Sequence, residues 1–177
     1  MNLLLQAAHF AAEKHQEQRR KNPAETPYIN HPLEVAAHLS SVGHVTDESL
    51  LAAAILHDTV EDTDTSPEEL CELFGEEITA LVMECTDDKS LEKAERKRLQ
   101  IVNAPKKSAG AKQIKLADKT CNLRSILVDP PEGWSAERQR EYFRWANQVI
   151  DGLLGVNEPL ETEVKRVLHE GYAKLGA

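Results

Sequence analysis

Cysteine and long apolar runs are scarce in this chain, and their scarcity excludes several classes of protein. The three cysteines, Cys71, Cys85 and Cys121, are odd in number, widely spaced and never arranged as CxxC. We therefore expect neither a disulfide framework nor a cysteine-rich zinc site. We also expect the protein to be cytoplasmic. No apolar run approaches the length of a membrane span, and the first residues lack the basic region of a signal peptide. We expect no membrane partner.

Positive charge is also in short supply. The chain has 21 lysine and arginine residues against 30 aspartate and glutamate residues, which gives a formal net charge of −9. Phosphate backbones reward a basic surface, so we expect no nucleic-acid partner. A small anionic ligand could still bind at a local basic cluster, such as residues 19–21 or 96–98.

The remaining composition predicts a helical globule. A length of 177 residues with 41% apolar content is sufficient for one domain with a substantial core. Apolar residues recur at helical spacing along most of the chain, and no alternating strand pattern is present. We therefore predict a single all-α domain that covers residues 1–177. Helices are expected at about residues 3–20, 31–43, 48–62, 67–75, 76–84, 91–102, 111–127, 135–155 and 158–174.

The most informative stretch is the acidic run at residues 57–62, His-Asp-Thr-Val-Glu-Asp, which directly follows an apolar helical segment. If the helix continues, Glu61 lies above His57 and Asp62 lies above Asp58, because residues four apart share a face. Burying this much charge costs several kcal/mol per ion unless it is compensated. A divalent cation would compensate it, so the run predicts a metal site.

Two further residues of the metal-ligand type lie beside apolar helical sequence. His31 stands at the start of a predicted helix, and Asp118 lies within the segment at residues 113–119. Each residue alone is commonly a helix cap or a solvent-facing group. Together with His57 and Asp58, however, they supply two imidazoles and two carboxylates, a set that suits manganese, iron or zinc, whereas calcium prefers more oxygen ligands. Such a set leaves positions open for water and a phosphate oxygen.

The order of these residues resembles that of the HD superfamily of metal-dependent phosphohydrolases. More narrowly, it resembles the hydrolase domain of the RelA/SpoT alarmone enzymes and the small alarmone hydrolases, which include the metazoan SpoT homologues. Six ordered motifs agree with this family, over a region of roughly residues 8–157. They lie at residues 18–21, 27–32, 57–62, 86–89, 95–98 and 115–124.

The resemblance implies an activity, which is removal of pyrophosphate from the 3′ position of guanosine tetra- and pentaphosphate. It also implies four ligands of a divalent metal, usually Mn²⁺, namely His31, His57, Asp58 and Asp118. The residues Glu61 and Asp62 match the acidic pair that orients or deprotonates the attacking water. Which of the two moves the proton is left open.

The same resemblance implies a set of contacts to a small guanine nucleotide. An arginine is expected to stack on the base, an asparagine one turn after Asp118 to contact the ribose, and a lysine one turn before it to meet a phosphate. For the tyrosine of this set, packing of the ring into the core is an equal alternative. The residues concerned are Arg20, Lys21, Lys115, Asn122 and Tyr142.

Two other functions are compatible with the sequence. One is a phosphatase of the same superfamily that acts on another nucleotide such as NADPH, because only substrate-side residues would differ. The other is a non-catalytic module that binds the alarmone. The intact pair of Glu61 and Asp62 argues against the binding module, since a sensor needs no water-orienting carboxylates. The sequence leaves open the native metal and the oligomeric state, including a homodimer.

Overall fold

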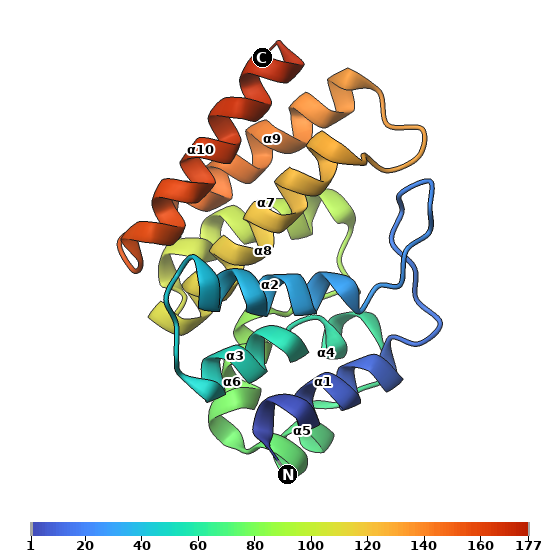
Figure 1. The fold of residues 1–177 in the computed structure, drawn as a ribbon, viewed down its shortest axis with the longest axis vertical. Helices are drawn as coiled ribbons and strands as arrows, with labels where there is room; N and C mark the ends of the chain where they lie inside the picture. Colours follow the sequence, from blue (N-terminus) through green and yellow to red (C-terminus); the bar gives the residue numbers. More distant parts are fainter. Residues whose placement is uncertain (1, 177) are drawn as a thin grey trace.

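A computed structural model describes residues 2–176 and places nearly all of them in helices or the short turns between them (Figure 1). Over this range there is no strand, and one isolated antiparallel bridge joins Arg19 to Pro27. The predicted single all-α domain is confirmed. The helices are α1 (Leu3–Lys14), α2 (Asn30–Ser41), α3 (Glu48–Leu56), α4 (Thr59–Asp62), α5 (Pro67–Phe74), α6 (Glu76–Cys85), α7 (Lys93–Asn103), the 3-10 helix η1 (Ala104–Lys106), α8 (Ala109–Val128), α9 (Ala136–Asp151) and α10 (Glu158–Leu175).

Two helices, α3 and α8, form the centre of the molecule. All residues from Leu50 to Leu56 in α3 are buried, because α3 packs against α1, α2, α6 and α8. The 20-residue α8 is buried along residues 114–121 and also contacts α2, α6, α9 and α10. A helix that is covered on all sides belongs to the core. The segments that carry His57 and Asp118 are therefore both held by the interior.

Local side-chain chemistry sets many of the helix boundaries. Asp47 begins α3 by accepting the N–H groups of Ser49 and Leu50. Ser66 begins α5 in the same way, because its Oγ accepts the N–H of Glu69 at 3.1 Å. Other N-cap side chains come from Asn2, Ser108, Ser135 and Asn157. These ends could be predicted because the caps are local.

The first helix is shorter than predicted, and this difference matters for the site. Helix α1 ends at Lys14, so the expected continuation to residue 20 is wrong. The following backbone pairs with a later segment instead: the N–H of Arg20 donates to Thr26 O at 2.8 Å, and that of Tyr28 donates to Gln18 O at 3.0 Å. This arm, residues 15–29, crosses the end of the bundle and carries Arg20 toward α8 (Figure 1).

The helix also breaks within the acidic run, where a continuous helix was expected. Helix α3 ends at Leu56 and α4 restarts at Thr59. Side chains compete for the carbonyl groups there, because Thr59 Oγ1 donates to Leu56 O and the His57 ring contacts Ala54 O, both at 2.7 Å. The N–H of Asp62 still donates to the carbonyl of Asp58 at 2.9 Å, so the one-turn relation between those two residues survives.

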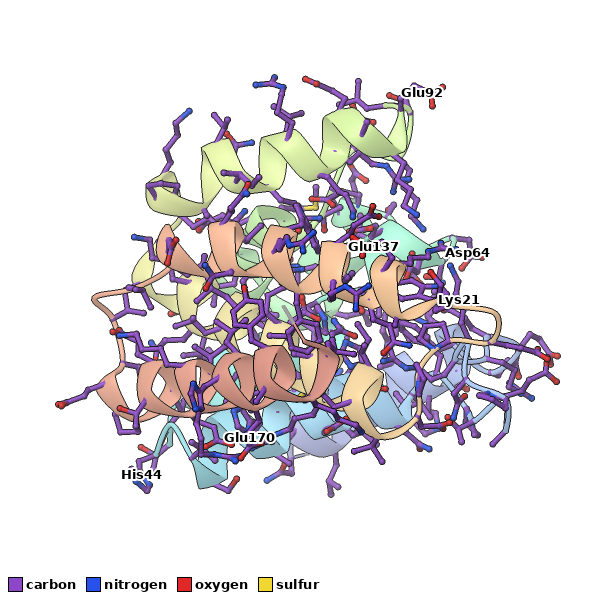
Figure 2. All side chains as sticks on the ribbon, turned by 90° about the horizontal axis from the view of Figure 1, so that it is seen from above. Lys21, His44, Asp64, Glu92, Glu137 and Glu170 are labelled. Carbon is purple, nitrogen blue, oxygen red and sulfur yellow. The ribbon has the colours of Figure 1, made fainter. Side chains whose placement is uncertain are left out.

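Charged side chains cover the outside of the bundle. Glu92, Glu137 and Glu170 are all exposed, and Figure 2 shows Glu92 at the outer edge of the molecule. Among the helices of residues 2–176, none combines the length and the apolar character that crossing a membrane requires.

Candidate metal centre and active site

Three buried groups converge from three helices. His31 comes from the first turn of α2, His57 from the end of α3, and Asp118 from the middle of α8. One donor atom from each lies within 4.8 Å of the other two. The Oδ1 atom of Asp118 is 3.1 Å from His31 Nε2 and 4.0 Å from His57 Nε2. These side chains are at most 6% exposed, so the cluster is largely closed off from bulk water.

The fourth predicted ligand, Asp58, lies on the more open side of this cluster. Its Oδ2 atom is 3.1 Å from His57 Nε2 and 3.9 Å from His31 Nε2. The hydroxyl of Tyr28 donates to the same oxygen at 2.6 Å and fixes the orientation of the carboxylate. The structure thus brings all four predicted ligand residues together.

The protonation pattern of His57 fits a metal ligand. Its Nδ1 lies 2.7 Å from the carbonyl oxygen of Ala54, which can only accept, so Nδ1 carries the proton. In the neutral ring the Nε2 atom therefore presents its lone pair to the cluster, and it is buried without a hydrogen-bond partner in the described chain. Burial lowers the pKa of His57, but the Asp58 and Asp118 carboxylates outweigh burial and raise it, so a metal would compete with a proton for this atom. Backbone-oriented imidazoles of this kind are usual around bound metals. Two nitrogen and two oxygen donors suit a divalent ion of intermediate hardness.

Two lysines keep Asp118 ionised. The Nζ atoms of Lys115 and Lys119 lie 3.0 and 3.5 Å from Asp118 Oδ2. Burial alone would raise the pKa of Asp118, but these ammonium groups and the hydrogen bond with His31 hold the pKa well below its usual range. In return, Asp118 outweighs the effect of burial on Lys115 and raises its pKa. A cation approaching the centre meets a fully charged carboxylate.

The acidic pair lies in two different environments. Burial raises the pKa of Glu61, whose Oε2 accepts the backbone N–H of Asp87 at 3.0 Å. Asp62 instead forms an ion pair with Lys89 and accepts a hydrogen bond from Gln18 Nε2 at 3.4 Å. A carboxylate with a raised pKa is the better proton acceptor near neutral pH. The environments therefore favour Glu61 as the proton acceptor and Asp62 as an orienting group.

Two adjoining cavities open beside these carboxylates. The first has a volume of about 440 Å³ and the second about 520 Å³. Four of the five predicted substrate residues line the first cavity, namely Arg20, Lys21, Asn122 and Tyr142. The acidic pair lines the second cavity, and both cavities share Lys21, Asp62, Lys89 and Tyr142. The two spaces form one elongated site.

A chain of hydrogen bonds connects the wall of the first cavity to the metal centre. Arg20 Nη2 donates to Asn122 Oδ1 at 3.1 Å, and Asn122 Nδ2 donates to Asp118 Oδ1 at 2.6 Å. The predicted spacing of Asn122, one turn after Asp118, therefore produces a direct contact. The guanidinium of Arg20 also lies 5.8 Å from the ring centre of Tyr28.

Lys115 and Tyr142 occupy less obvious positions. Lys115 is only 7% exposed, lines neither of these two cavities and is engaged with Asp118. Its predicted phosphate contact stays a prediction. The ring of Tyr142 packs 5.7 Å from Trp134 and 5.2 Å from Trp145 between ring centres, yet its side chain lines both cavities. Core packing and access to a ligand therefore coexist at this residue.

Sequence reasoning assigned no role to several residues that complete the site. Tyr28 orients Asp58, the backbone of Asp87 holds Glu61, and Lys89 pairs with Asp62. Lys119 is 4% exposed and its Nζ atom also lies 4.7 Å from the Trp145 ring. All four lie inside the motifs matched to the family. A lysine among buried positions was the available signal at residue 119, but an isolated helical lysine is usually solvated.

Comparisons with known proteins agree with this arrangement. The model of the HD domain family matches residues 7–147. The chain is 57% identical to guanosine-3′,5′-bis(diphosphate) 3′-pyrophosphohydrolase MESH1 of Xenopus tropicalis, with 97% of this chain and 96% of the relative covered. It is 54% identical to the protein of the same name from Homo sapiens, with 94% and 93% covered.

A solved structure is similar to this chain in both sequence and fold. It is described as a metazoan ortholog of SpoT that hydrolyzes ppGpp and plays a role in starvation responses, and it superimposes with a TM-score of 0.93 at 51% identity, with 96% of each chain covered. The all-helical fold and the buried His-His-Asp cluster define an HD-type metal-dependent hydrolase. The chain belongs to the HD domain family and, within it, to the MESH1 proteins.

Proposed function

We propose that the chain is a guanosine-3′,5′-bis(diphosphate) 3′-pyrophosphohydrolase that releases pyrophosphate and leaves GDP or GTP. The observation that carries this proposal is the convergence of His31, His57 and Asp118 in one buried cluster, in a chain 57% identical to a hydrolase of that name. The adjoining cavities are large enough for a nucleotide and are lined by both basic and aromatic side chains.

We propose further that His31, His57, Asp58 and Asp118 hold the metal, and that the metal is Mn²⁺. When bound, a divalent ion of this kind supplies Lewis acidity, which lowers the pKa of water and polarises a phosphoryl oxygen. The donor set of imidazole and carboxylate groups supports a first-row metal over calcium or a thiolate-bound zinc. The contact from Tyr28 would keep Asp58 aimed at the ion.

The acidic pair would handle the water. Glu61, with its raised pKa, accepts a proton from the water as the oxygen attacks the phosphorus next to the ribose 3′ oxygen. The new bond joins water oxygen to phosphorus, the bond from phosphorus to the 3′ oxygen breaks, and that oxygen receives a proton. Asp62 orients the water while Lys89 and Gln18 hold its carboxylate in place.

The elongated site would hold the nucleotide across the metal centre. Arg20, in the first cavity, presents a flat guanidinium to the base, and Asn122 lies within reach of the ribose. Lys21 lines both cavities and is therefore placed to meet phosphate groups between them. Tyr142 would form part of the wall on the nucleotide side.

The double variant Glu61→Gln with Asp62→Asn tests this assignment. The amides retain the size of the carboxylates but cannot accept a proton, so turnover of the alarmone should fall by at least about 100-fold. Metal affinity should change little, because the four ligands remain. The measurements are pyrophosphate release with added manganese and metal content by elemental analysis. An unchanged rate in the double variant would remove the proposed role of the pair.

A nucleotide panel separates this function from its alternatives. The metal-loaded protein should release pyrophosphate from the alarmone rapidly, and chelation should stop that release. Exclusive release of orthophosphate from NADPH would favour a phosphatase on another nucleotide. Tight alarmone binding without any turnover in the metal-loaded protein would favour a binding module.

A further inference from the structure

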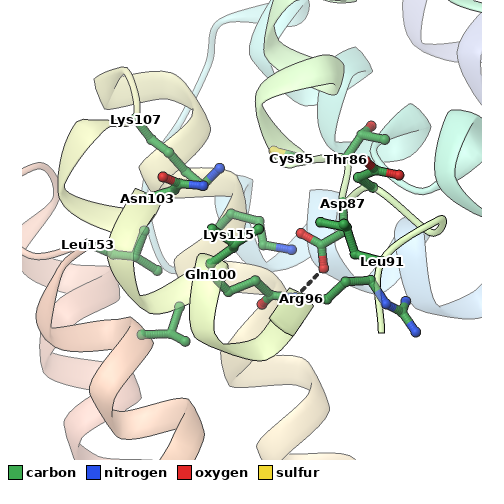
Figure 3. Close-up of a pocket in the computed structure, with 13 residues that line it drawn as sticks. Cys85, Thr86, Asp87, Leu91, Arg96, Gln100, Asn103, Lys107, Lys115 and Leu153 are labelled. Carbon is green, nitrogen blue, oxygen red and sulfur yellow. Dashed lines mark hydrogen bonds between the residues drawn. The ribbon is translucent and has the colours of Figure 1, made fainter. Parts of the chain in front are cut away.

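The two carboxylates of the acidic pair are held by different segments of the chain. Glu61 accepts the backbone N–H of Asp87, and the carboxylate of Asp87 accepts from the side-chain amide of Gln100 in α7 (Figure 3). Asp62 accepts a hydrogen bond from the arm at residues 15–29, which donates none to Glu61 within the described chain. The orientation of Asp62 therefore depends on what fixes the arm.

Each oxygen of Asp62 has its own partner. Lys89 pairs with Oδ1, and Gln18 Nε2 donates to Oδ2 at 3.4 Å. The Lys89 side chain is 49% exposed, and an exposed ion pair restrains a carboxylate little. The backbone of Gln18 is fixed, because its N–H donates to the His15 carbonyl and its own carbonyl accepts the N–H of Tyr28, both at 3.0 Å. Gln18 is therefore the partner better placed to set the plane of the carboxylate.

The imidazole of His15 fixes the side chain of Gln18. His15 is the residue at which α1 ends, and it is only 1% exposed. Its Nδ1 lies 2.6 Å from Gln18 Oε1. An ionised carboxylate only accepts, so the nitrogen of the Gln18 amide faces Asp62 and the amide oxygen faces His15. Because an amide oxygen also only accepts, Nδ1 carries the ring proton.

The face of the same imidazole supports Tyr28. The ring centres of His15 and Tyr28 are 4.9 Å apart, and the two planes are inclined by 37°. Rings at this separation are in contact. The hydroxyl of Tyr28 in turn donates to Asp58 Oδ2 at 2.6 Å. One buried ring therefore reaches Asp62 through its edge and Asp58 through its face.

Filling space does not by itself account for an imidazole at position 15. The Nε2 atom of His15 is buried and has no hydrogen-bond partner within residues 2–176. A buried polar atom without a partner carries a free-energy cost, which an apolar side chain of similar size would avoid. An imidazole offers, in return, a flat ring together with a donor at Nδ1.

We propose that His15 is a positioning residue for the hydrolytic reaction, with its edge acting on Asp62 and its face acting on Asp58. The edge sets the carboxylate that orients the water, so it should affect the rate of turnover. The face supports the Tyr28 hydroxyl, which limits rotation of a proposed metal ligand, so it should affect metal affinity. The effect on turnover rests on the proposed function, whereas the ring proton and the metal affinity are measured without any substrate.

Two variants of His15 separate the edge from the face. His15→Phe keeps a ring against Tyr28 but has no donor for Gln18. Its kcat for the alarmone at saturating manganese should fall by at least about 5-fold, while KM and the affinity for Mn²⁺ stay within about 2-fold. His15→Asn can present an amide nitrogen where Nδ1 stands but has no ring. Its kcat should stay within about 2-fold, while its affinity for Mn²⁺ falls by about 3- to 10-fold.

The measurements are pyrophosphate release and competition for manganese with a metal-binding dye. His9→Phe is the matched control, because His9 is an exposed histidine of the same helix whose one ion pair is with Glu13. Both readouts of this control should equal those of the unmodified chain. Losses of kcat and of Mn²⁺ affinity that occur together in both His15 variants would overturn the proposal, because a purely structural role moves the two readouts in parallel.

The route through Gln18 has its own test. Gln18→Met removes the donor to Asp62, so kcat should fall by at least about 5-fold. Adding His15→Phe to Gln18→Met should lower kcat no further, because both changes break the same connection. Losses that multiply in the double variant would contradict an action of His15 through Gln18.

Nitrogen-15 NMR of histidine-labelled, chelator-treated protein locates the ring proton. The His15 signals are identified by their loss in His15→Asn, and they should show the proton on Nδ1. A proton on Nε2 with none on Nδ1 would overturn the proposal. If His15→Phe does not fold, the ring proton and His15→Asn decide. If the unmodified chain did not turn over the alarmone, the proposed function would fail, whereas the ring proton and the metal affinities would still test His15.

Discussion

A single hydroxyl group orients the most accessible of the four proposed metal ligands, Asp58. The Tyr28 hydroxyl donates to Asp58 Oδ2 at 2.6 Å, and no other residue in the described chain donates to that oxygen with hydrogen-bond geometry. Partners of metal ligands commonly contribute to affinity because they limit how far a ligand can rotate. The contact comes from the arm, not from the helices that carry the ligands.

Tyr28→Phe should therefore weaken metal binding without unfolding the protein. We expect a loss of affinity for Mn²⁺ of roughly 10- to 100-fold, measured by competition with a metal-binding dye. Tyr142→Phe is the matched control, because the Tyr142 hydroxyl has no hydrogen-bond partner in the described residues, and its metal affinity should not change. Equal affinities for Tyr28→Phe and the unmodified chain would contradict the orienting role.

A buried histidine away from the site gives a pH dependence to the stability. His38 is 4% exposed, and burial together with the nearby Arg124 cation lowers its pKa to about 4, with Glu163 opposing. Its unfolded pKa is about 6.5. As pH falls below 6.5 the unfolded chain binds a proton that the folded chain does not, so the free energy of unfolding falls until pH reaches about 4.

The expected loss attributable to His38 between pH 7 and 5 is roughly 1–2 kcal/mol, after allowance for solvent screening. Urea unfolding at several pH values measures it, and His38→Gln supplies the comparison, since glutamine can still accept from Arg124 but does not titrate. The carboxylates of the chain contribute equally to the pH dependence of stability in both proteins. Identical pH slopes for the two proteins would assign the dependence to groups other than His38.

At the scale of elements, the spacing along α8 explains why one helix supplies so much of the site. Lys115, Asp118 and Asn122 are separated by three and four residues, so they share a face, and both flanking residues contact Asp118. Lys119 reaches the same carboxylate from the next position. Helical spacing is local, so the sequence was sufficient to place Lys115 and Asn122 one turn before and after Asp118, but their contacts with Asp118 were not predicted.

The close contact between α9 and α10 depends on a glycine. A Cβ atom added at Gly171 in α10 would overlap the ring of Phe143 in α9, and that ring is fully buried. Gly171→Ala should destabilise the protein by about 1–3 kcal/mol, because a well-packed ring has little room to move. The unfolding midpoint in urea measures this loss.

Gly110→Ala is the control for this prediction. Its Cβ would meet chiefly the flexible end of Leu81, and alanine favours a helix over glycine by about 1 kcal/mol. We expect its stability to stay within about 1 kcal/mol of the unmodified chain. If Gly171→Ala were no less stable than Gly110→Ala, the two helices would have to be further apart than the structure places them.

The arm at residues 15–29 shows where prediction from sequence stopped at the scale of elements. Residues 13–20 contain no glycine or proline that would end a helix, yet the backbone of Arg20 pairs with Thr26 and leaves the helix. No local signal in residues 15–20 competes with helix, because the pairing is made across a loop. The break at His57 and Asp58 was hidden for a related reason, since it depends on side chains that take backbone carbonyl groups.

At the scale of the whole molecule, a bound metal would couple folding to function. The proposed ligands come from α2, the end of α3 and α8, so only the folded chain can present them together. At 100 times its dissociation constant, a metal that binds only the folded state adds about 2.7 kcal/mol of stability. For a chain of this length, the melting temperature should rise by roughly 5–10 °C when manganese replaces chelator.

Two variants assign this shift to the proposed centre. Asp118→Asn should abolish it, whereas Glu61→Gln with Asp62→Asn should retain it, because the acidic pair is not among the proposed ligands. Thermal melting with and without manganese is the measurement for both. A full shift in Asp118→Asn would place the stabilising metal at another site.

The features that the sequence alone determined are those that depend on neighbouring residues or on a regular spacing along the chain. Apolar spacing indicated the helices, and ordered motifs identified the candidate ligands. The tertiary structure alone decided that Tyr28 holds Asp58 and that the backbone of Asp87 holds Glu61. Those contacts join residues 26 or more positions apart. The physical reason is that helical periodicity reports which face of a segment is buried, but not which distant segment covers that face.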